Sequence, residues 1–484
     1  MILTILAFSM VIVFMTLIMT RRMAPLTALI LVPIVFGVLG GFASSLGGMM
    51  LAGVTKIAPT GIMLTFAILY FAIMIDAGLF DPVVTALVRV VGDDPARVVL
   101  GTAALALVVS LDGDGSTTYM ITTAAMLPLY RRLGIRPLVL ACVTMLAGGV
   151  MNILPWGGPT ARAASALSVD VSELFVPMIP SMLVGAGFVL FAAWRMGVRE
   201  RERLAGVTSS HTDHDAAVRG SVDNTHRRRP KLLVVNAVLT ATLMTALVIG
   251  LMPLPVLFMV GFALAIVINY PSVAEQKELL ATHAANAMAV ASLIFAAGIF
   301  TGILSGTKMV DAMAVSVVRA VPEALGPYLT IVTGVLSIPF TFFISNDAFY
   351  FGILPILAKA GQAYGITAAE MGRASLIGQP VHLLSPLVPS TYLLVSLAGV
   401  EFDAHQRFTI RWAILVSLVL LGAGLVTAVM PIAGHPAPSA SMVSDPMTSI
   451  PRRNDPCEHQ NRNDRQLSPP SILRYSLMSS TSSV

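Results

Sequence analysis

Within an otherwise apolar stretch, the chain carries the polar sequence Ser110-Leu111-Asp112-Gly113-Asp114-Gly115-Ser116-Thr117-Thr118. Glycine adopts backbone conformations that end a helix, so this sequence predicts a break between two apolar half-helices. A charged Asp at the centre of a bilayer costs at least about 2.5 kcal/mol even on the most lenient insertion scale. Two such residues therefore predict a cation, a proton or a buried partner at the tip of a membrane-embedded helical hairpin.

The composition around this sequence is that of a membrane protein. Of 484 residues, 56% are hydrophobic and only 11% are charged, whereas a soluble domain carries about 25% charged residues. We expect about ten full spans and two segments of paired half-spans, which makes an all-α, multi-pass protein of the cell (inner or plasma) membrane. Clear examples of spans are Ile2–Thr20, Ala24–Phe42, Leu174–Trp194, Leu232–Met252, Leu254–Tyr270 and Ala413–Met430.

The charge of the chain argues for membrane topology and against nucleic acid as a partner. The net charge is +5, but Lys and Arg lie in the loops between apolar spans, where they determine orientation. The Ser-, Thr-, His- and Asp-containing stretch 195–231 is rich in arginine and is predicted to be a flexible cytoplasmic connector. The polar stretch 433–484 has too little apolar surface to order itself and is predicted to be a disordered tail.

The connector separates two similar halves, 1–194 and 232–432, related by an offset of about 230 residues. Arg89 then corresponds to Arg319, and Pro159-Thr160 to Pro389-Ser390. In each half we expect a hairpin (about 98–130 and 328–358) followed by a broken helix (about 137–168 and 373–398). If the basic loops all lie in the cytoplasm, the two hairpins enter from opposite faces. This predicts two repeats of inverted topology, an architecture common among secondary transporters.

Three further polar sequences accompany the first one. The second hairpin carries Ser345-Asn346-Asp347, and the expected broken helices carry 152–162 and 379–391, both rich in Pro and Gly. Proline lacks the backbone donor that a helix needs, and unwound backbone at membrane depth survives only beside protein or a wet cavity. Helix N-termini exposed in this way bind anions and free carbonyl groups bind cations, so the pattern predicts a site for an anion together with a cation.

The side chains of these sequences suggest roles. Hard divalent cations take oxygen ligands, which makes Asp112, Asp114 and Asp347 candidate metal ligands, although they could instead only cap the half-helices. Asp114, Asp347 and His382 are candidates for proton coupling, and Arg162 could either clamp a substrate carboxylate or pair with one of the aspartates. The candidate substrate-binding residues are Ser116, Thr117, Asn152, Gly157, Gly158, Thr160, Arg162, Ser345, Asn346, Ser390 and Thr391.

The strings Asp112-Gly-Asp-Gly-Ser-Thr-Thr-Tyr119, Asn152-Ile-Leu-Pro-Trp-Gly-Gly-Pro-Thr160 and Ile344-Ser-Asn-Asp347 resemble the citrate–divalent-metal/proton symporter family of the ion transporter superfamily. The resemblance implies uptake of citrate or a similar carboxylate as its complex with Mg²⁺ or Ca²⁺, coupled to protons. It also implies a scaffold domain and a mobile domain, often in a homodimer within the lipid bilayer. The divalent cation is then part of the substrate, and no cofactor is bound permanently.

Several alternative functions are compatible with the same sequence features. Sodium-coupled relatives carry Ser-Asn-Thr at both hairpin tips, whereas the first tip of this chain has no Asn, which argues against sodium coupling. Another superfamily activity is possible: transport of a free di- or tricarboxylate or a gluconate-like anion with protons or sodium, or cation/proton antiport. An intramembrane aspartyl protease would need Gly-x-Gly-Asp, which is absent here. A hydrolase built from Ser385, His382 and Asp347 would lack a nucleophile elbow.

Overall fold

The computed structural model describes residues 2–205 and 227–434, apart from 321 and 323, and this part is helical without any strand. Helices α1 to α9 span Ile2–Met19, Pro25–Leu39, Leu46–Asp76, Asp81–Val91, Pro95–Val109, Gly115–Arg132, Pro137–Met151, Gly158–Leu167 and Val171–Ala205. Helices α10 to α19 span Leu233–Val248, Leu254–Asn269, Val273–Gly306, Met309–Ala320, Leu329–Phe343, Leu354–Gln362, Ala368–Ser375, Gln379–His382, Pro389–Ala398 and Phe402–Val426.

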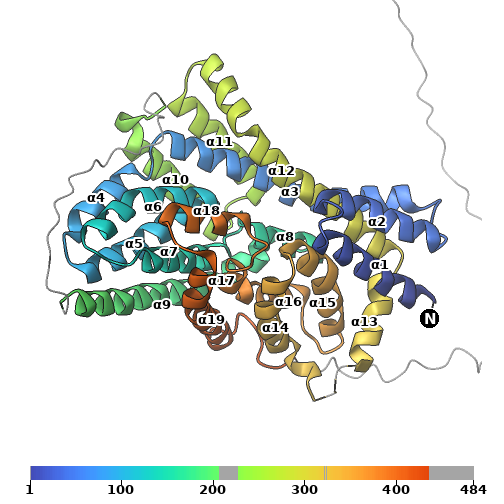
Figure 1. Cartoon of the computed structure of the whole chain (residues 1–484). Helices are drawn as coiled ribbons and strands as arrows, with labels where there is room; N and C mark the ends of the chain where they lie inside the picture. The colour runs from blue at the N-terminus through green and yellow to red at the C-terminus, as the bar shows by residue number, and fades with distance from the viewer. Residues whose placement is uncertain (1, 206–226, 321, 323, 435–484) are drawn as a thin grey trace, which may run out of the picture. The chain divides into compact units, whose positions relative to one another are not determined.

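The two halves run through the same order of elements (Figure 1). Each has a long helix followed by a short amphipathic one, α3–α4 in the first half and α12–α13 in the second. A helical hairpin comes next, α5–α6 and α14–α15, then a broken helix, α7–α8 and α16–α18, then a final long helix, α9 and α19. Pro at the first or second position begins α5, α7, α8 and α18, where its missing N–H costs no helical hydrogen bond.

The helices are those of a multi-pass membrane protein. Among the described residues, seven helical segments are long and apolar enough to cross a membrane, and α1, α2, α7, α11 and α18 are shorter apolar helices. The spans expected from the sequence coincide with α1, α2, α9, α10, α11 and α19 to within a few residues, with two exceptions. Helix α9 ends later than expected, at Ala205, and α19 begins earlier than expected, at Phe402. Helix α9 continues to Ala205, so the start of the predicted connector at 195 is helical rather than flexible. The rest of that connector up to 226, and the predicted tail from 435, lie outside the described residues.

The long helices α3 and α12 pack against each other along glycines. A Cβ atom added to Gly53 would lie 2.0 Å from the backbone oxygen of Gly298 and 2.7 Å from Cα of Gly302, so only hydrogen fits there. Helices α2 and α11 contact the same pair, α2 on α12 and α11 on α3. In Figure 1 these four helices follow one another across the upper part of the molecule.

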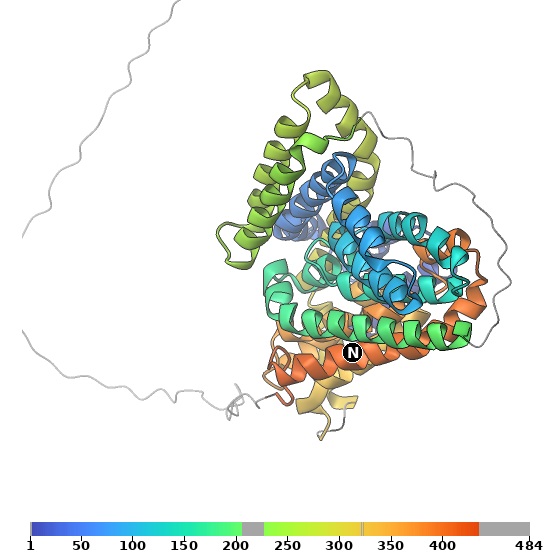
Figure 2. The same ribbon diagram turned by 90° about the vertical axis from the view of Figure 1, so that its left-hand side faces the viewer.

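The hairpins and broken helices pack together as a second group. Helices α5, α7 and α19 all contact α9, and Figure 2 shows α9 running beside α19. Every residue of α7 from Val139 to Val150 is buried. A Cβ atom on Gly149 would lie 2.6 Å from Cα of Pro380 in α17, so the two broken helices meet there by direct backbone contact. Burial on all sides explains why α7 is almost entirely apolar and shows no polar face.

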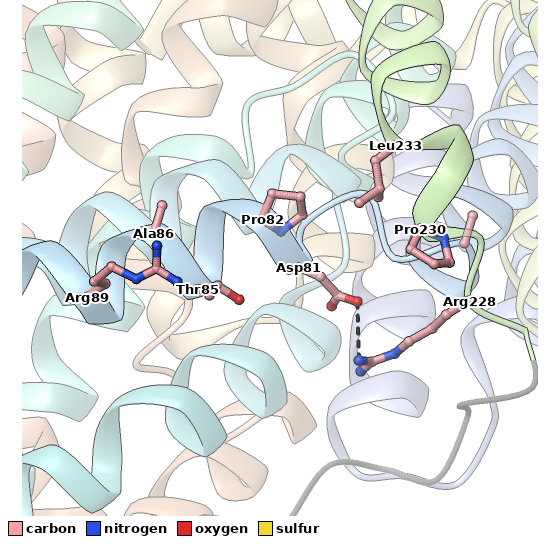
Figure 3. A pocket seen from close by; sticks show the side chains of 9 residues that line it. Asp81, Pro82, Thr85, Ala86, Arg89, Arg228, Pro230 and Leu233 are labelled. Atoms are coloured by element: carbon pink, nitrogen blue, oxygen red, sulfur yellow. Dashed lines mark ion pairs between the residues drawn. The ribbon is translucent and has the colours of Figure 1, made fainter.

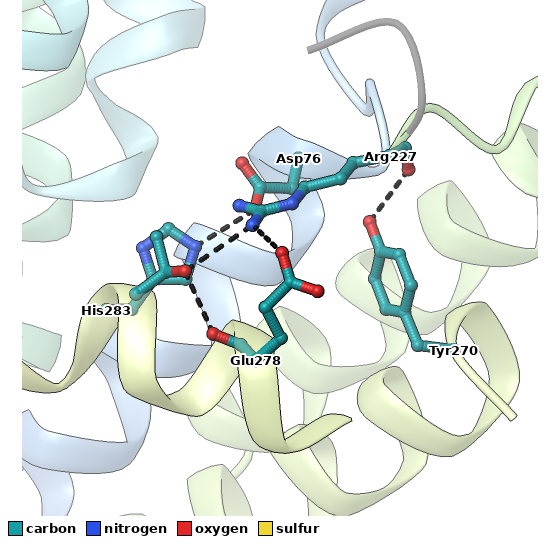
Figure 4. Close-up of polar contacts among 6 residues, drawn as sticks. Asp76, Arg227, Tyr270, Glu278 and His283 are labelled. Atoms are coloured by element: carbon teal, nitrogen blue, oxygen red, sulfur yellow. Dashed lines mark hydrogen bonds and ion pairs between the residues drawn. The ribbon is translucent and has the colours of Figure 1, made fainter. Parts of the chain in front are cut away.

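A polar cluster joins the end of α3 to the start of α12 (Figure 4). Asp76, the last residue of α3, lies 2.9 Å from Nε2 of His283 and 3.4 Å from Nη1 of Arg227. The same guanidinium lies 2.9 Å from Glu278, and the hydroxyl of Tyr270 donates to the backbone oxygen of Arg227. The end of the connector is thereby fixed on the helix ends before α10 begins.

Candidate functional site

The tip of the first hairpin is a tight polar turn. Helix α5 ends at Val109, a 3-10 turn covers Ser110–Asp112, and Gly113 has φ +77° before α6 begins. Asp112 accepts the backbone N–H of Asp114 at 2.9 Å with Oδ1. Its Oδ2 is buried without a hydrogen-bond partner among the described residues. A buried carboxylate oxygen without a partner is costly, which marks this tip as a place where a ligand would be stabilised.

Asp114 is the N-cap of α6. Its two carboxylate oxygens accept the backbone N–H groups of Ser116 and Thr117, both at 3.1 Å, and Oδ2 also accepts the Thr117 hydroxyl at 2.6 Å. The capping role left open by the sequence is therefore present. Each carboxylate oxygen has further lone pairs, so a cap of this kind can still face a cation.

Trp156 fixes this tip to the break between α7 and α8. Its Nε1 donates to the backbone oxygen of Leu111 at 2.9 Å, and its ring lies against Gly113, where a Cβ atom would come within 2.5 Å of Cδ1. The break itself is equally tight. A Cβ atom on Gly157 would lie 2.4 Å from the backbone oxygen of Asn152, so a side chain is excluded there.

The tip of the second hairpin forms an ion pair with α8. Arg162 Nε donates to Asp347 Oδ1 at 2.6 Å, and the two side chains are only 21% and 14% exposed. Gly158 makes room for the arginine, because a Cβ atom there would lie 2.5 Å from Arg162 Nη1. In the same tip the Ser345 hydroxyl accepts the N–H of Ala348 at 3.2 Å, and Asn346 Oδ1 is buried without a hydrogen-bond partner among the residues described.

A buried chain of hydrogen bonds connects the two broken helices to the second hairpin. Asn152 Nδ2 donates to Gln379 Oε1 at 3.0 Å, and Gln379 Nε2 donates to the Tyr350 hydroxyl at 2.8 Å. That hydroxyl donates to the backbone oxygen of Ser375 at 3.3 Å. Asn152 enters this series of hydrogen bonds through its Nδ2 donor, so its Oδ1 atom takes no part in it. Neither Gln379 nor Tyr350 was among the predicted site residues, although Gln379 begins the polar sequence 379–391 that predicts the second broken helix.

A cavity of about 100 Å³ lies between the first hairpin tip, the end of α7 and the start of α18. It is lined by Ser110, Gly113, Asp114, Gly115, Thr118, Tyr119, Gly148, Met151, Asn152, Leu383 and Ser390. Tyr119 is wholly buried, and its hydroxyl has no hydrogen-bond partner among the described residues. The predicted residues Asp114, Asn152 and Ser390 thus share one space with a tyrosine that the sequence did not single out.

The remaining predicted hydroxyl residues bind backbone. The Thr160 hydroxyl donates to the oxygen of Ile153 at 2.8 Å, and the Thr391 hydroxyl donates to the oxygen of Leu383. Both residues lie near the start of the helix that follows the break, and each satisfies a carbonyl group that the break frees.

His382 and Ser385 hold the second break against α14. His382 Nδ1 lies 2.6 Å from the backbone oxygen of Thr341, and the Ser385 hydroxyl donates to the oxygen of Phe342 at 2.6 Å. The two side chains therefore bind different carbonyl groups instead of each other, and they do not form the pair that a serine hydrolase requires.

The three predicted metal ligands do not form a preformed cage. Among the residues that the structure describes, no group of three or more His, Cys, Asp or Glu side chains is placed to hold a metal ion. Asp112 and Asp114 share the first tip, while Asp347 is paired with Arg162 at the second.

Known proteins resemble this chain along most of its length. Residues 14–378 match the family described as "Citrate transporter". The chain is 57% identical over 431 residues to a "Citrate transporter" of Bacillus subtilis (strain 168), a match covering 88% of this chain and 99% of the relative. It is 49% identical over 431 residues to a "Mg(2+)/citrate complex secondary transporter" of the same organism, covering 89% and 99% respectively.

Among solved structures, the fold resembles that of the YdaH transporter of Alcanivorax borkumensis. The TM-score is 0.57 at 16% sequence identity, and the match covers 81% of this chain and 90% of that chain. At this identity the likeness concerns the fold alone.

Proposed function

The chain belongs to the citrate transporter family, and from this premise we propose that it takes up citrate complexed with a divalent cation, Mg²⁺ or Ca²⁺, in symport with protons. Members of this family are transporters, not enzymes. The relative named for the Mg²⁺/citrate complex supports the metal-bound form of the substrate. The residues at the two hairpin tips supply the rest of the argument.

The ion pair of Arg162 and Asp347 is the observation that carries the proposal. Its atoms are 2.6 Å apart and both side chains are largely buried between the second hairpin tip and α8. Asp347 occupies the place that a substrate carboxylate would take on the guanidinium, whose planar donor groups suit a carboxylate. An anion alone would have to displace a buried carboxylate that stays charged, and that is unfavourable.

A cation removes this obstacle. When a proton or the divalent cation neutralises Asp347, the attraction that holds Arg162 is lost and the guanidinium becomes free for citrate. Fully ionised citrate carries three negative charges, so its complex with one divalent cation retains a single negative charge. One arginine matches that charge, and binding of anion and cation at the same site couples the two.

The first hairpin tip completes the proposed site. Asp114 and Asn152 line the cavity and Asp112 belongs to the same turn, so their acceptor oxygens favour the cation, while the N-terminus of α8 next to Arg162 favours the carboxylates. Both tips and both breaks lie in one packed group of helices. Transport would then proceed by alternating access, with this group moving relative to α3 and α12, and the proposed inverted repeats and homodimer would fit that movement.

The proposal is tested by uptake of radiolabelled citrate into proteoliposomes. We expect uptake with Mg²⁺ or Ca²⁺ outside, faster uptake when the outside is more acidic, and loss of uptake with a chelator. Uptake that is unchanged by the chelator would overturn the metal complex as substrate. It would favour the second candidate, a transporter of free di- or tricarboxylate, because a proton on Asp347 would then be enough to free Arg162 for that anion without a metal.

A further inference from the structure

A second pocket lies between the end of α3, helix α4 and the start of α10 (Figure 3). Its volume is about 520 Å³. Most of the wall is apolar, and Asp81, Thr85, Arg89 and Arg228 add polar groups. The full lining consists of Ala77, Asp81, Pro82, Thr85, Ala86, Arg89, Arg228, Pro230 and Leu233.

The charge of the pocket is positive overall. Arg228 Nη1 lies 3.3 Å from Asp81 Oδ2, so these two charges offset each other. Arg89 follows Asp81 two helical turns later in α4, on the face that also carries Thr85 and Ala86. No described residue forms a hydrogen bond or ion pair with Arg89. The Arg89 guanidinium therefore faces the pocket without a carboxylate partner. The Arg228 guanidinium beside it is only partly occupied by its ion pair with Asp81.

The pocket lies where apolar helices end. Helix α3 ends at Asp76 and α10 begins at Leu233, and the charged cluster of Figure 4 lies at the same junction. Such a belt of Arg, Asp, Glu and His beside apolar spans is typical of the boundary between hydrocarbon and water. Beyond the pocket, α10 presents Val234 and Val238, which are 76% and 60% exposed. An apolar surface therefore adjoins the cationic pocket.

We propose that this pocket binds the headgroup of an anionic phospholipid, with Arg89 and Arg228 on the phosphate and the acyl chains along the exposed valines of α10. Guanidinium groups recognise phosphate through paired donors, and basic pockets between membrane helices are suited to acidic lipids. A free phosphate would use the arginines but would leave the apolar wall uncovered. The inference does not depend on citrate being the substrate.

The pocket lies at the turn between α3 and α4, so a bound lipid would lie where the group of helices that contains α3 meets the group that contains the hairpins. Gly78 has φ +87° and makes the turn from α3 into α4, and Asp81 begins α4 at that turn. A lipid that binds Arg89 and Arg228 therefore touches both α4 and the connector end that is fixed on α3. Its headgroup stabilises one angle between α3 and α4.

The test compares full-length protein with the variant Arg89→Gln after purification in detergent, with mass spectrometry of the retained phospholipid. Phosphatidylglycerol is then titrated into the delipidated protein while thermal stability is recorded. We expect Arg89→Gln to weaken phosphatidylglycerol binding about tenfold, as loss of a charge-assisted bond does. The matched control is Arg319→Gln, because Arg319 stands in the equivalent last turn of α13 but lines no part of this pocket.

The outcomes separate the possible ligands. Weaker phosphatidylglycerol binding in Arg89→Gln, with Arg319→Gln unchanged and phosphatidylcholine inert, supports the proposal. Equal binding by both variants overturns it. Stabilisation by inorganic phosphate equal to that by phosphatidylglycerol also overturns it, since the pocket would then be a site for a free anion.

Discussion

Breaking the ion pair between Arg162 and Asp347 should cost stability in a way that depends on which charges remain. Only 21% and 14% of these side chains are exposed, so each single variant leaves the other charge largely buried. Loss of one partner of a buried pair costs about 3–5 kcal/mol, and the partial exposure places our expectation at about 3 kcal/mol for Arg162→Gln and for Asp347→Asn. The double variant removes both charges and should lose about 1 kcal/mol or less.

The assay is unfolding in detergent with increasing denaturant, alongside citrate uptake in proteoliposomes. All three variants should fail to take up citrate, although the double variant is almost as stable as the unmodified protein. The pair Lys359–Asp311 is the matched control, because its atoms are 3.1 Å apart but both side chains are 42% exposed. Its coupling should stay below about 1 kcal/mol. If the stability lost in the double variant equals the sum of the losses in Arg162→Gln and Asp347→Asn, the two side chains do not interact and the buried ion pair is absent.

Three further predictions concern the breaks and the first tip. Asp114→Asn should abolish uptake but change stability by less than about 1 kcal/mol, because Asn also caps helices well. Asp170 makes a similar capping bond, so the control variant Asp170→Asn should leave uptake intact. If both variants took up citrate equally well, Asp114 would not belong to the site. Gly157→Ala should destabilise the protein by at least about 2 kcal/mol through backbone overlap, whereas Gly187→Ala, which meets nothing within 4 Å, should be neutral in the same unfolding assay. Gln379→Leu should raise the KM for citrate about tenfold by releasing Asn152, with little change in the maximal rate; an unchanged KM would refute that role.

Much of the fold was accessible from the sequence because breaks in membrane helices have strong local signals. Gly113 between two aspartates and the Pro- and Gly-containing strings each interrupt long apolar stretches, and the structure places both hairpins and both broken helices there. The family resemblance was confirmed by the comparisons. The start of the connector was predicted too early, because an arginine-rich stretch can continue an amphipathic helix such as the end of α9.

The site was less accessible because it depends on contacts between distant segments. The sequence left Arg162 with two partners, a substrate or an aspartate, and only the fold brings it to Asp347. Tyr119 and Tyr350 look like ordinary apolar-helix tyrosines, and no local pattern says which one faces a cavity and which one joins a hydrogen-bond chain. The sequence assigned Asp112 and Asp114 to one hairpin and Asp347 to the other, but only packing shows that Asp347 pairs with Arg162.

The most direct measurement counts citrate and metal entering the same vesicles. Proteoliposomes with a lumenal indicator for Mg²⁺, and in a second preparation for Ca²⁺, are given radiolabelled citrate with the matching cation. We expect one cation to enter with each citrate, and neither to enter in Asp347→Asn. Citrate that accumulates while the lumenal cation stays constant would contradict transport of the complex.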